Sequence, residues 1–186
     1  MQNVGEEIAG EYLRICKSCD FIQYNLQNPD IQGEIDVVGI SLKENTVYLC
    51  EVAIHLITGL QYVDQKTKQT NNVAKLIQKL EKDWKYAAKY FPKYKHVLMV
   101  WSPIVKSSRD GAKNNQLKDI DVIQKHFKDK HGIELQFVAN QKYWECLQEL
   151  RGYTLKETKE LKSPVLRYLQ IEEHLRNRLR INSGRI

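Results

Sequence analysis

The sequence contains no uninterrupted apolar stretch long enough to cross a lipid bilayer. A membrane-spanning helix needs roughly 20 consecutive apolar residues, and every apolar run in this chain of 186 residues is far shorter. The first residues, MQNVGEEIAGEYL, are acidic and lack the basic start and apolar run of a secretory signal. These absences predict a cytoplasmic protein without a membrane partner.

Cysteine is also scarce, with four residues in the chain. In the cytoplasm these thiols are expected to stay reduced. Cys16 and Cys19 form a C-x-x-C motif, but no second cysteine pair or nearby histidine pair completes a zinc site. We therefore expect structural cysteines rather than a zinc centre.

The rest of the composition is typical of a folded globular protein with a basic surface. Hydrophobic residues make up 42% of the chain and charged residues 28%, which is too apolar for intrinsic disorder. The length suits one domain with a substantial core. The net charge of +6 favours an anionic partner, but nucleic acid, an acidic protein and a membrane surface all remain open on this ground.

Hydrophobic periodicity predicts alternating helices and strands. Apolar residues that recur every three or four positions indicate helices, and β-branched or continuous apolar runs indicate strands. The predicted helices cover residues 6–16, 72–90, 118–130 and 141–151, and the predicted strands cover 21–25, 34–40, 46–54, 96–101 and 133–139. This order indicates an α/β protein with a mixed sheet flanked by helices, which starts with an antiparallel hairpin at SLKEN and has a loop at 102–116.

The segment 163–186 is predicted to be a basic helical appendage to a domain of residues 1–162. Ser163 and Pro164 suit the N-cap and the first turn of a helix. A weak apolar stripe and a basic end follow, formed by Val165, Leu166, Leu169, Leu175 and Leu179 and by Arg167, Arg176, Arg178, Arg180 and Arg185. Such a stripe needs a partner surface, and a homodimer would supply one.

Two acidic residues interrupt apolar strands that are expected to lie side by side. Asp36 falls in EIDVVGI and Glu51 in TVYLCEVAI. Carboxylates near a sheet surface are costly to desolvate unless a cation compensates, and Mg²⁺ prefers oxygen ligands of this kind. The pair therefore suggests a metal site, although strand alternation also permits both side chains to point into solvent.

The order of short motifs adds a resemblance to a known superfamily. GEE (5–7) lies in the first predicted helix, GEID (33–36) and CEV (50–52) lie in the hairpin, and a lysine-rich helix and an apolar strand follow. Over roughly residues 4–101 this order resembles the PD-(D/E)xK nuclease superfamily, which has the restriction-endonuclease-like fold. Within that superfamily it is similar to archaeal Holliday junction resolvases and small bacterial endonuclease-like proteins.

The resemblance implies a metal-dependent DNA endonuclease. It makes Asp36 and Glu51 the metal-binding acids, with Mg²⁺ as the cofactor and Mn²⁺ as a substitute, and it makes Glu6 an additional catalytic glutamate. Glu7 competes with Glu6 for that role. A structural role is open for either glutamate, because acidic residues near a helix N-terminus interact favourably with the helix dipole.

The sequence departs from this superfamily at the catalytic lysine. The lysine belongs two residues after the second acid, where this chain has Ala53. A methyl group cannot offset negative charge at a phosphate, so another cation replaces the lysine or hydrolysis is lost. The candidate replacements are Lys66, Lys68 and Lys75, with His55 two residues further along the predicted strand, and each of them is equally compatible with a solvated surface or neighbour-paired position.

A row of lysines on the helix at 72–90 is a candidate DNA-binding surface. The cations are Lys75, Lys79, Lys82, Lys85, Lys89 and Lys93, and Lys106, Arg109 and Lys113 occur in the following loop. At 1.5 Å per residue the six lysines span about 27 Å and could follow a phosphate backbone. A lysine-rich outer face also serves solubility. Two hypotheses follow: a metal-dependent DNA endonuclease, or an inactive nuclease-derived module for DNA binding or assembly.

Overall fold

The computed structural model describes residues 3–29, 33–63, 70–108 and 115–179. Their helices and strands alternate along the chain after the first hairpin, as the periodicity predicts. The five helices are α1 (Val4–Cys16), α2 (Asn72–Tyr90), α3 (Gln116–His131), α4 (Asn140–Lys156) and α5 (Pro164–Leu179), and the five strands are β1 (Phe21–Gln27), β2 (Glu34–Ser41), β3 (Thr46–Val52), β4 (Lys95–Ser102) and β5 (Gln136–Ala139).

The strands form one mixed sheet in the order β1-β2-β3-β4-β5. The first three strands are antiparallel, whereas β3, β4 and β5 are parallel. Parallel neighbours require crossover connections, and α2 and α3 supply them. The predicted α/β class, with a mixed sheet, flanking helices and a C-terminal helix, is confirmed.

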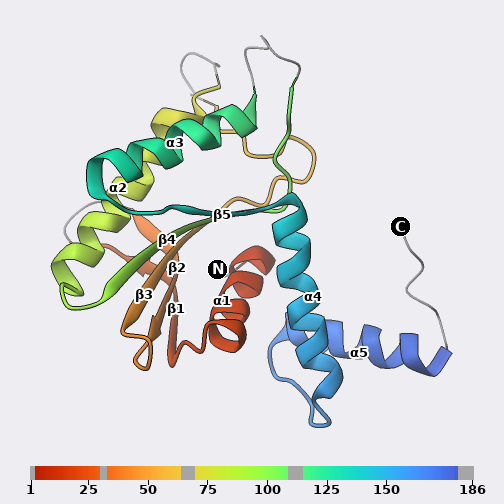
Figure 1. The fold of residues 1–186 in the computed structure, drawn as a ribbon. Helices are drawn as coiled ribbons and strands as arrows, with labels where there is room; N and C mark the ends of the chain where they lie inside the picture. The colour runs from red at the N-terminus through yellow and green to blue at the C-terminus, as the bar shows by residue number, and fades with distance from the viewer. Residues whose placement is uncertain (1–2, 30–32, 64–69, 109–114, 180–186) are drawn as a thin grey trace.

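Helices cover both faces of the sheet (Figure 1). On one face α2 and α3 pack against the sheet through buried side chains such as Leu80 and Phe127. On the other face α1 and α4 contribute Leu13 and Leu150. Strand β4 is buried on both sides because its apolar residues alternate between these two cores.

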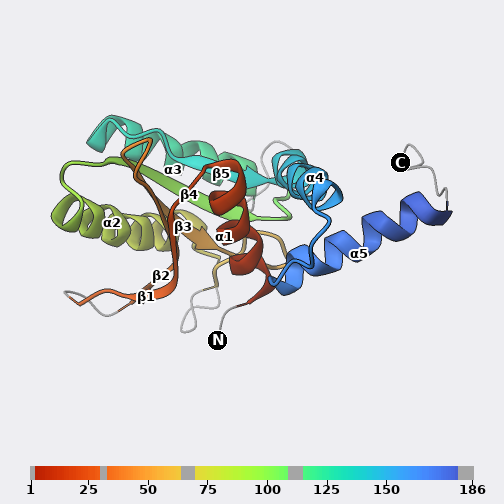
Figure 2. The same ribbon diagram turned by 90° about the horizontal axis from the view of Figure 1, so that it is seen from below.

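The last helix, α5, begins inside the fold and ends outside it. Leu166 is fully buried against the core that also contains Leu150 of α4. Ser163 Oγ accepts a hydrogen bond from the Leu166 amide at 3.4 Å, in agreement with the predicted helix start. The rest of α5 projects away from the body (Figure 2), and Leu175 and Leu179 are exposed there. The core of residues 1–162 therefore supplies a partner for the first half of the apolar stripe.

Several predicted boundaries are wrong. Strand β3 ends at Val52 rather than at residue 54, and β5 begins at Gln136 rather than at 133. The amide of Ile133 instead bonds to Phe127 O at the end of α3, where Gly132 adopts a left-handed conformation with φ 67°. Capping of the helix therefore uses the backbone groups that a longer strand would need.

The remaining differences extend predicted elements. β1 continues to Gln27, α3 begins at Gln116, where Asn115 caps it, and α4 runs on to Lys156. All four cysteines are free thiols. Among the described residues, no helix combines the length and the apolar character that spanning a membrane requires.

Candidate functional site

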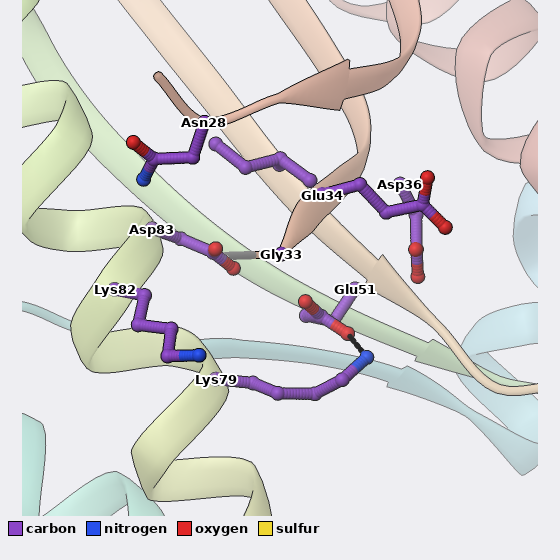
Figure 3. A pocket seen from close by; sticks show the side chains of 9 residues that line it. Asn28, Gly33, Glu34, Asp36, Glu51, Lys79, Lys82 and Asp83 are labelled. Atoms are coloured by element: carbon purple, nitrogen blue, oxygen red, sulfur yellow. Dashed lines mark hydrogen bonds and ion pairs between the residues drawn. The ribbon is translucent and has the colours of Figure 1, made fainter. Parts of the chain in front are cut away.

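Asp36 and Glu51 line one cavity between the sheet and α2 (Figure 3). The cavity, called the acid cavity below, has a volume of about 270 Å³. Asp36 is 9% exposed and Glu51 1% exposed, so neither side chain points freely into solvent. Besides these two acids its lining includes Asn28, Gly33, Glu34, Ile35, Lys79, Lys82 and Asp83.

Asp36 lies where the pairing of β2 with β3 ends. The last paired residues are Val37 and Cys50. One position further on, Asp36 Oδ2 accepts a hydrogen bond from the Val52 amide at 2.7 Å. The carboxylate thus takes the place of a main-chain acceptor, which fixes its position at the mouth of the hairpin. On the neighbouring strand Asn25 has a φ of 49°, so β1 is irregular at the same level.

Glu51 forms an ion pair with Lys79, and Figure 3 shows this contact. Glu51 comes from β3, whereas Lys79 comes from the second turn of α2. The Lys79 side chain is 44% exposed, so its ammonium group connects the buried carboxylate with the cavity opening. The lysine predicted for the outer, DNA-binding face is therefore directed toward the acids.

Asp83 is a third buried carboxylate in this cavity. It follows Lys79 by four residues, which places both on one side of α2. Asp83 is 3% exposed, and its Oδ2 atom has no hydrogen-bond partner. A buried polar atom without a partner is costly, and a hydrogen bond between the protonated Asp83 carboxyl group and Glu51 offsets part of that cost.

Burial and mutual repulsion perturb the titration of this cluster. Burial, opposed by the Val52 amide, raises the pKa of Asp36. Burial and the nearby Asp36 raise the pKa of Glu51 to about 7, although Lys79 opposes the shift. Burial and the charge of Glu51 raise the pKa of Asp83 well above its usual range. Despite the cost of burial, the Glu51 carboxylate raises the pKa of Lys79, so the ammonium stays charged. Such perturbed groups in a cavity are frequent at functional sites.

Glu6 and Glu7, the two competing glutamates, have different surroundings. Glu6 lines a second cavity of about 460 Å³, called the outer cavity, together with Asp36 and Lys79. Its carboxylate also closes the capping box of α1 and accepts a hydrogen bond from Asn25 at 3.3 Å. Glu7 instead accepts hydrogen bonds from Ser163 Oγ at 2.6 Å and the Val165 amide at 3.1 Å. Glu6 is thus near the acids, and Glu7 caps α5.

The other predicted cations are dispersed. Lys82 lines the acid cavity, whereas Lys75, Lys89 and Lys106 are exposed. Lys66, Lys68 and Arg109 lie outside the described residues. The expectation that His55 extends from the β3 face is wrong because the strand ends at Val52, but His55 does line the outer cavity.

Ala53 is buried and also lines the outer cavity. Its amide donates to Trp101 O at 2.8 Å, which ties it to β4. Asp36 and Lys79 line the same cavity. The site therefore contains an ammonium group at Lys79, supplied by α2 rather than by β3.

The donors of the acid cavity fit a hard divalent cation. Asp36 and Glu51 offer carboxylate oxygens, and Mg²⁺ is commonly held by one or two carboxylates while it retains several waters. The Asp83 carboxyl group is a further oxygen donor in a cavity whose described lining has four acids, Glu34, Asp36, Glu51 and Asp83, and two lysines, Lys79 and Lys82. Within the described part of the chain, no group of three or more His, Cys, Asp and Glu side chains is arranged to hold a metal ion. Water or substrate oxygens would have to complete the shell.

Comparison with known proteins leaves the site to be interpreted from its own geometry. No family model, curated protein or solved structure matches the chain. The class defined by fold and site is therefore an α/β protein with a buried cluster of acids and one paired lysine between a sheet and a helix.

Sequence reasoning did not assign Lys79 or Asp83 to the acid cluster, although a signal was present. Asp83 occupies a position on the buried face of α2 that also carries Leu76, Leu80 and Ala87. An acid on an otherwise apolar stripe is unexpected in a helix that only packs. The lysine one turn earlier shares that side of the helix, and the pair marks where α2 approaches the acids of β2 and β3.

Proposed function

We propose that the protein is a Mg²⁺-dependent endonuclease that hydrolyses phosphodiester bonds of DNA, and that Lys79 serves as the cation missing at position 53. The observation that carries the proposal is the convergence of Asp36, Glu51 and Lys79, from three different elements, on one cavity. The resemblance to PD-(D/E)xK nucleases in motif order supports the same reaction.

Each side chain has a role that its surroundings favour. Asp36 and Glu51 would hold the metal, which when bound lowers the pKa of water and offsets charge on a phosphate. The Lys79 ammonium is charged and partly exposed, so it can contact a phosphoryl oxygen that enters the cavity. In a site with little water such a contact is strong. Glu6 would influence the site through its charge near Asp36.

DNA would approach along α2 and the adjacent loop. Lys75, Lys85, Lys89 and Lys106 are exposed, and contacts from such lysines to phosphates position DNA without reading its sequence. Lys82 also lines the acid cavity, so it can contact DNA beside the proposed cleavage site. The free thiols are compatible with the proposed cytoplasmic location.

The test is cleavage of supercoiled, linear and branched DNA in the presence of Mg²⁺ or Mn²⁺. We expect the wild-type protein to cut at least one of these substrates, and Asp36→Ala and Glu51→Ala to abolish cutting. Glu44→Ala changes an exposed acid in the β2–β3 turn and is the matched control, with activity unchanged. Cleavage that survives both cavity substitutions would remove these acids from the mechanism.

A second candidate function is DNA binding without hydrolysis. It is favoured by Ala53 and by the finding that no group of three ligating side chains occurs among the described residues. This alternative predicts DNA retention that falls steeply with salt, with no product under any metal condition. Binding without cleavage would therefore select it over the enzyme.

A homodimer is the proposed partner for the outer half of α5. Tyr168, Ile171, Leu175 and Leu179 are exposed at spacings of three and four residues, which places them along one side of the helix. Leu175→Glu is expected to convert a dimer into a monomer in light scattering without loss of folding. A wild-type monomer at high concentration would exclude this partner.

A further inference from the structure

An apolar groove lies next to the outer cavity. It has a volume of about 530 Å³, within the range of ligand sites. Val4, Gly5 and Ile54 line both the groove and the outer cavity. The groove therefore adjoins the outer cavity, which Asp36 and Lys79 also line, and the shared residues separate the two spaces.

The wall between the two spaces depends on a close approach at Gly5. A Cβ atom at Gly5 would lie 2.3 Å from two side-chain carbons of Ile54. A larger residue at this position would require the Ile54 side chain to move, so glycine allows the segment after β3 to pass close to the first turn of α1. Ile54 thus lies between the outer cavity on one side and the apolar groove on the other.

The groove has no charged side chain in its lining, in which Asn140 is the one amide among apolar and aromatic side chains such as Ile8, Leu56 and Trp144. The Asn140 amide is occupied, because Nδ2 donates to Val105 O and Oδ1 accepts from the Val105 amide, both at 2.9 Å. A phosphate would find no counter-charge here. An uncharged, flat and largely apolar group would be accommodated.

Trp144 offers such a group a surface for stacking. It is 53% exposed on α4, whereas Trp101 is fully buried and Trp84 stacks on His131 with ring centroids 3.8 Å apart. Leu56, 67% exposed, also lines the groove. Aromatic side chains beside a nucleic-acid site commonly stack on unpaired bases, irrespective of sequence.

We propose that the apolar groove binds an unstacked nucleobase next to the phosphate that Lys79 and a metal ion on Asp36 and Glu51 would hold, so that the preferred substrate is DNA with unpaired bases at the cleavage position. This inference rests on the proposed function, which supplies the phosphate. The position of the groove beside the outer cavity and its lack of charge favour a base over the sugar-phosphate backbone. In duplex DNA the base remains stacked and is not available to Trp144.

The test compares binding of a labelled oligonucleotide, alone and annealed to its complement, without divalent cation so that cleavage does not interfere. Trp144→Ala is expected to weaken single-strand binding roughly 5- to 150-fold, the usual effect of losing one stacking partner. Duplex binding should change less than about twofold, within the effect of a surface substitution. Trp144→Phe should retain most of the affinity. Phe21→Ala removes another exposed aromatic ring, which lines none of the three cavities, and should have no effect.

The outcomes separate this inference from the proposed function. If Trp144→Ala weakens neither form, or both equally, the groove holds no base, although cleavage by the wild-type protein would still support the enzyme. If the wild-type protein neither binds nor cleaves DNA, both proposals fail. If Trp144→Ala instead dissociates a dimer in sedimentation and leaves single-strand binding unchanged, a second copy of the chain occupies the groove and the inference is overturned.

Discussion

The ammonium group of Lys79 on α2 forms an ion pair with the carboxylate of Glu51 on β3, 28 positions earlier in the chain. Asp36, from the neighbouring strand, lines the same cavity. Two acids and a lysine from three different elements thus meet at one cavity. The Lys79 ammonium group offsets part of the negative charge of the acid cluster.

Replacement of Lys79 by methionine is expected to lower the cleavage rate at least 100-fold. Loss of one group that stabilises charge in a transition state typically costs this much, and methionine keeps the apolar stem in place. Lys85→Met removes an exposed lysine from the same helix and should reduce cleavage only slightly. Rates measured under single-turnover conditions provide the comparison, and equal losses in the two variants would contradict a special role for Lys79.

A lysine exchange tests the position of the missing cation directly. Ala53 borders the outer cavity together with Asp36 and Lys79, so Ala53→Lys directs an ammonium group toward the same space. We expect Ala53→Lys to restore part of the activity that Lys79→Met loses, as seen in the cleavage rate of the double variant. If Lys79→Met alone keeps full activity, Lys79 does not replace the lysine missing at position 53, and the double variant has no lost activity to restore.

Magnesium or manganese should stabilise the folded protein. A ligand present at 100 times its dissociation constant contributes about 2.7 kcal/mol, or roughly 5 to 11 °C in Tm for a protein of this size. Asp36→Asn keeps an acceptor for the Val52 amide but removes the negative charge, so its Tm should not respond to the metal. Thermal unfolding with and without the ion is the measurement. An equal shift in both proteins would place the ion elsewhere.

Asp83→Asn is expected to stabilise the protein at alkaline pH. The pKa of Asp83 is higher in the folded protein than in the unfolded chain. The stability that protonated Asp83 contributes is therefore complete at pH values below its pKa in the unfolded chain. This stability is lost as the pH rises through its pKa in the folded protein. Asparagine stays neutral at every pH. Each 1 kcal/mol of unfolding free energy that Asp83→Asn recovers raises Tm by roughly 2 to 4 °C. This increase in Tm should be present at pH 8 and small at pH 4.

The exposed Asp121 on α3 supplies the control for this experiment, because Asp121→Asn should leave the pH profile of Tm unchanged. Destabilisation by Asp83→Asn at pH 8 would mean that the carboxylate has a stabilising partner in its ionised form.

Glu6→Gln and Glu7→Gln should have opposite consequences. Glutamine preserves the capping box of α1, so Glu6→Gln should retain Tm while it changes the charge near Asp36 and lowers cleavage. Glu7→Gln weakens the charged acceptor for Ser163 and the Val165 amide and should cost about 1 kcal/mol of stability with cleavage preserved. Cleavage rates and Tm measured on both variants show which glutamate acts in cleavage. If Glu7→Gln lowers cleavage and Glu6→Gln lowers Tm instead, Glu7 is the glutamate of the proposed catalytic site.

The sequence predicted the sheet well because its strands have strong local signals. Continuous burial on both sides marks β4, and the polar segment SLKEN marks the β2–β3 turn. The start of β5 was wrong because capping of α3 by Gly132 and Ile133 competes with extension of the strand, and this competition is decided by tertiary packing. Periodicity reports which residues are apolar but not which backbone groups find partners.

The sequence by itself determined the order of elements and the two acids that interrupt β2 and β3, since both follow from local patterns of apolar and polar residues. Only the tertiary structure decided which lysine approaches those acids and which glutamate of α1 is near them. The crossover from β3 through α2 places Lys79 and Asp83 over Glu51, and the docking of α5 engages Glu7 while Glu6 remains beside Asp36. Asp83 on the apolar face of α2 gave a local sign of a buried polar site, but contacts between residues distant in sequence depend on how the helices pack on the sheet.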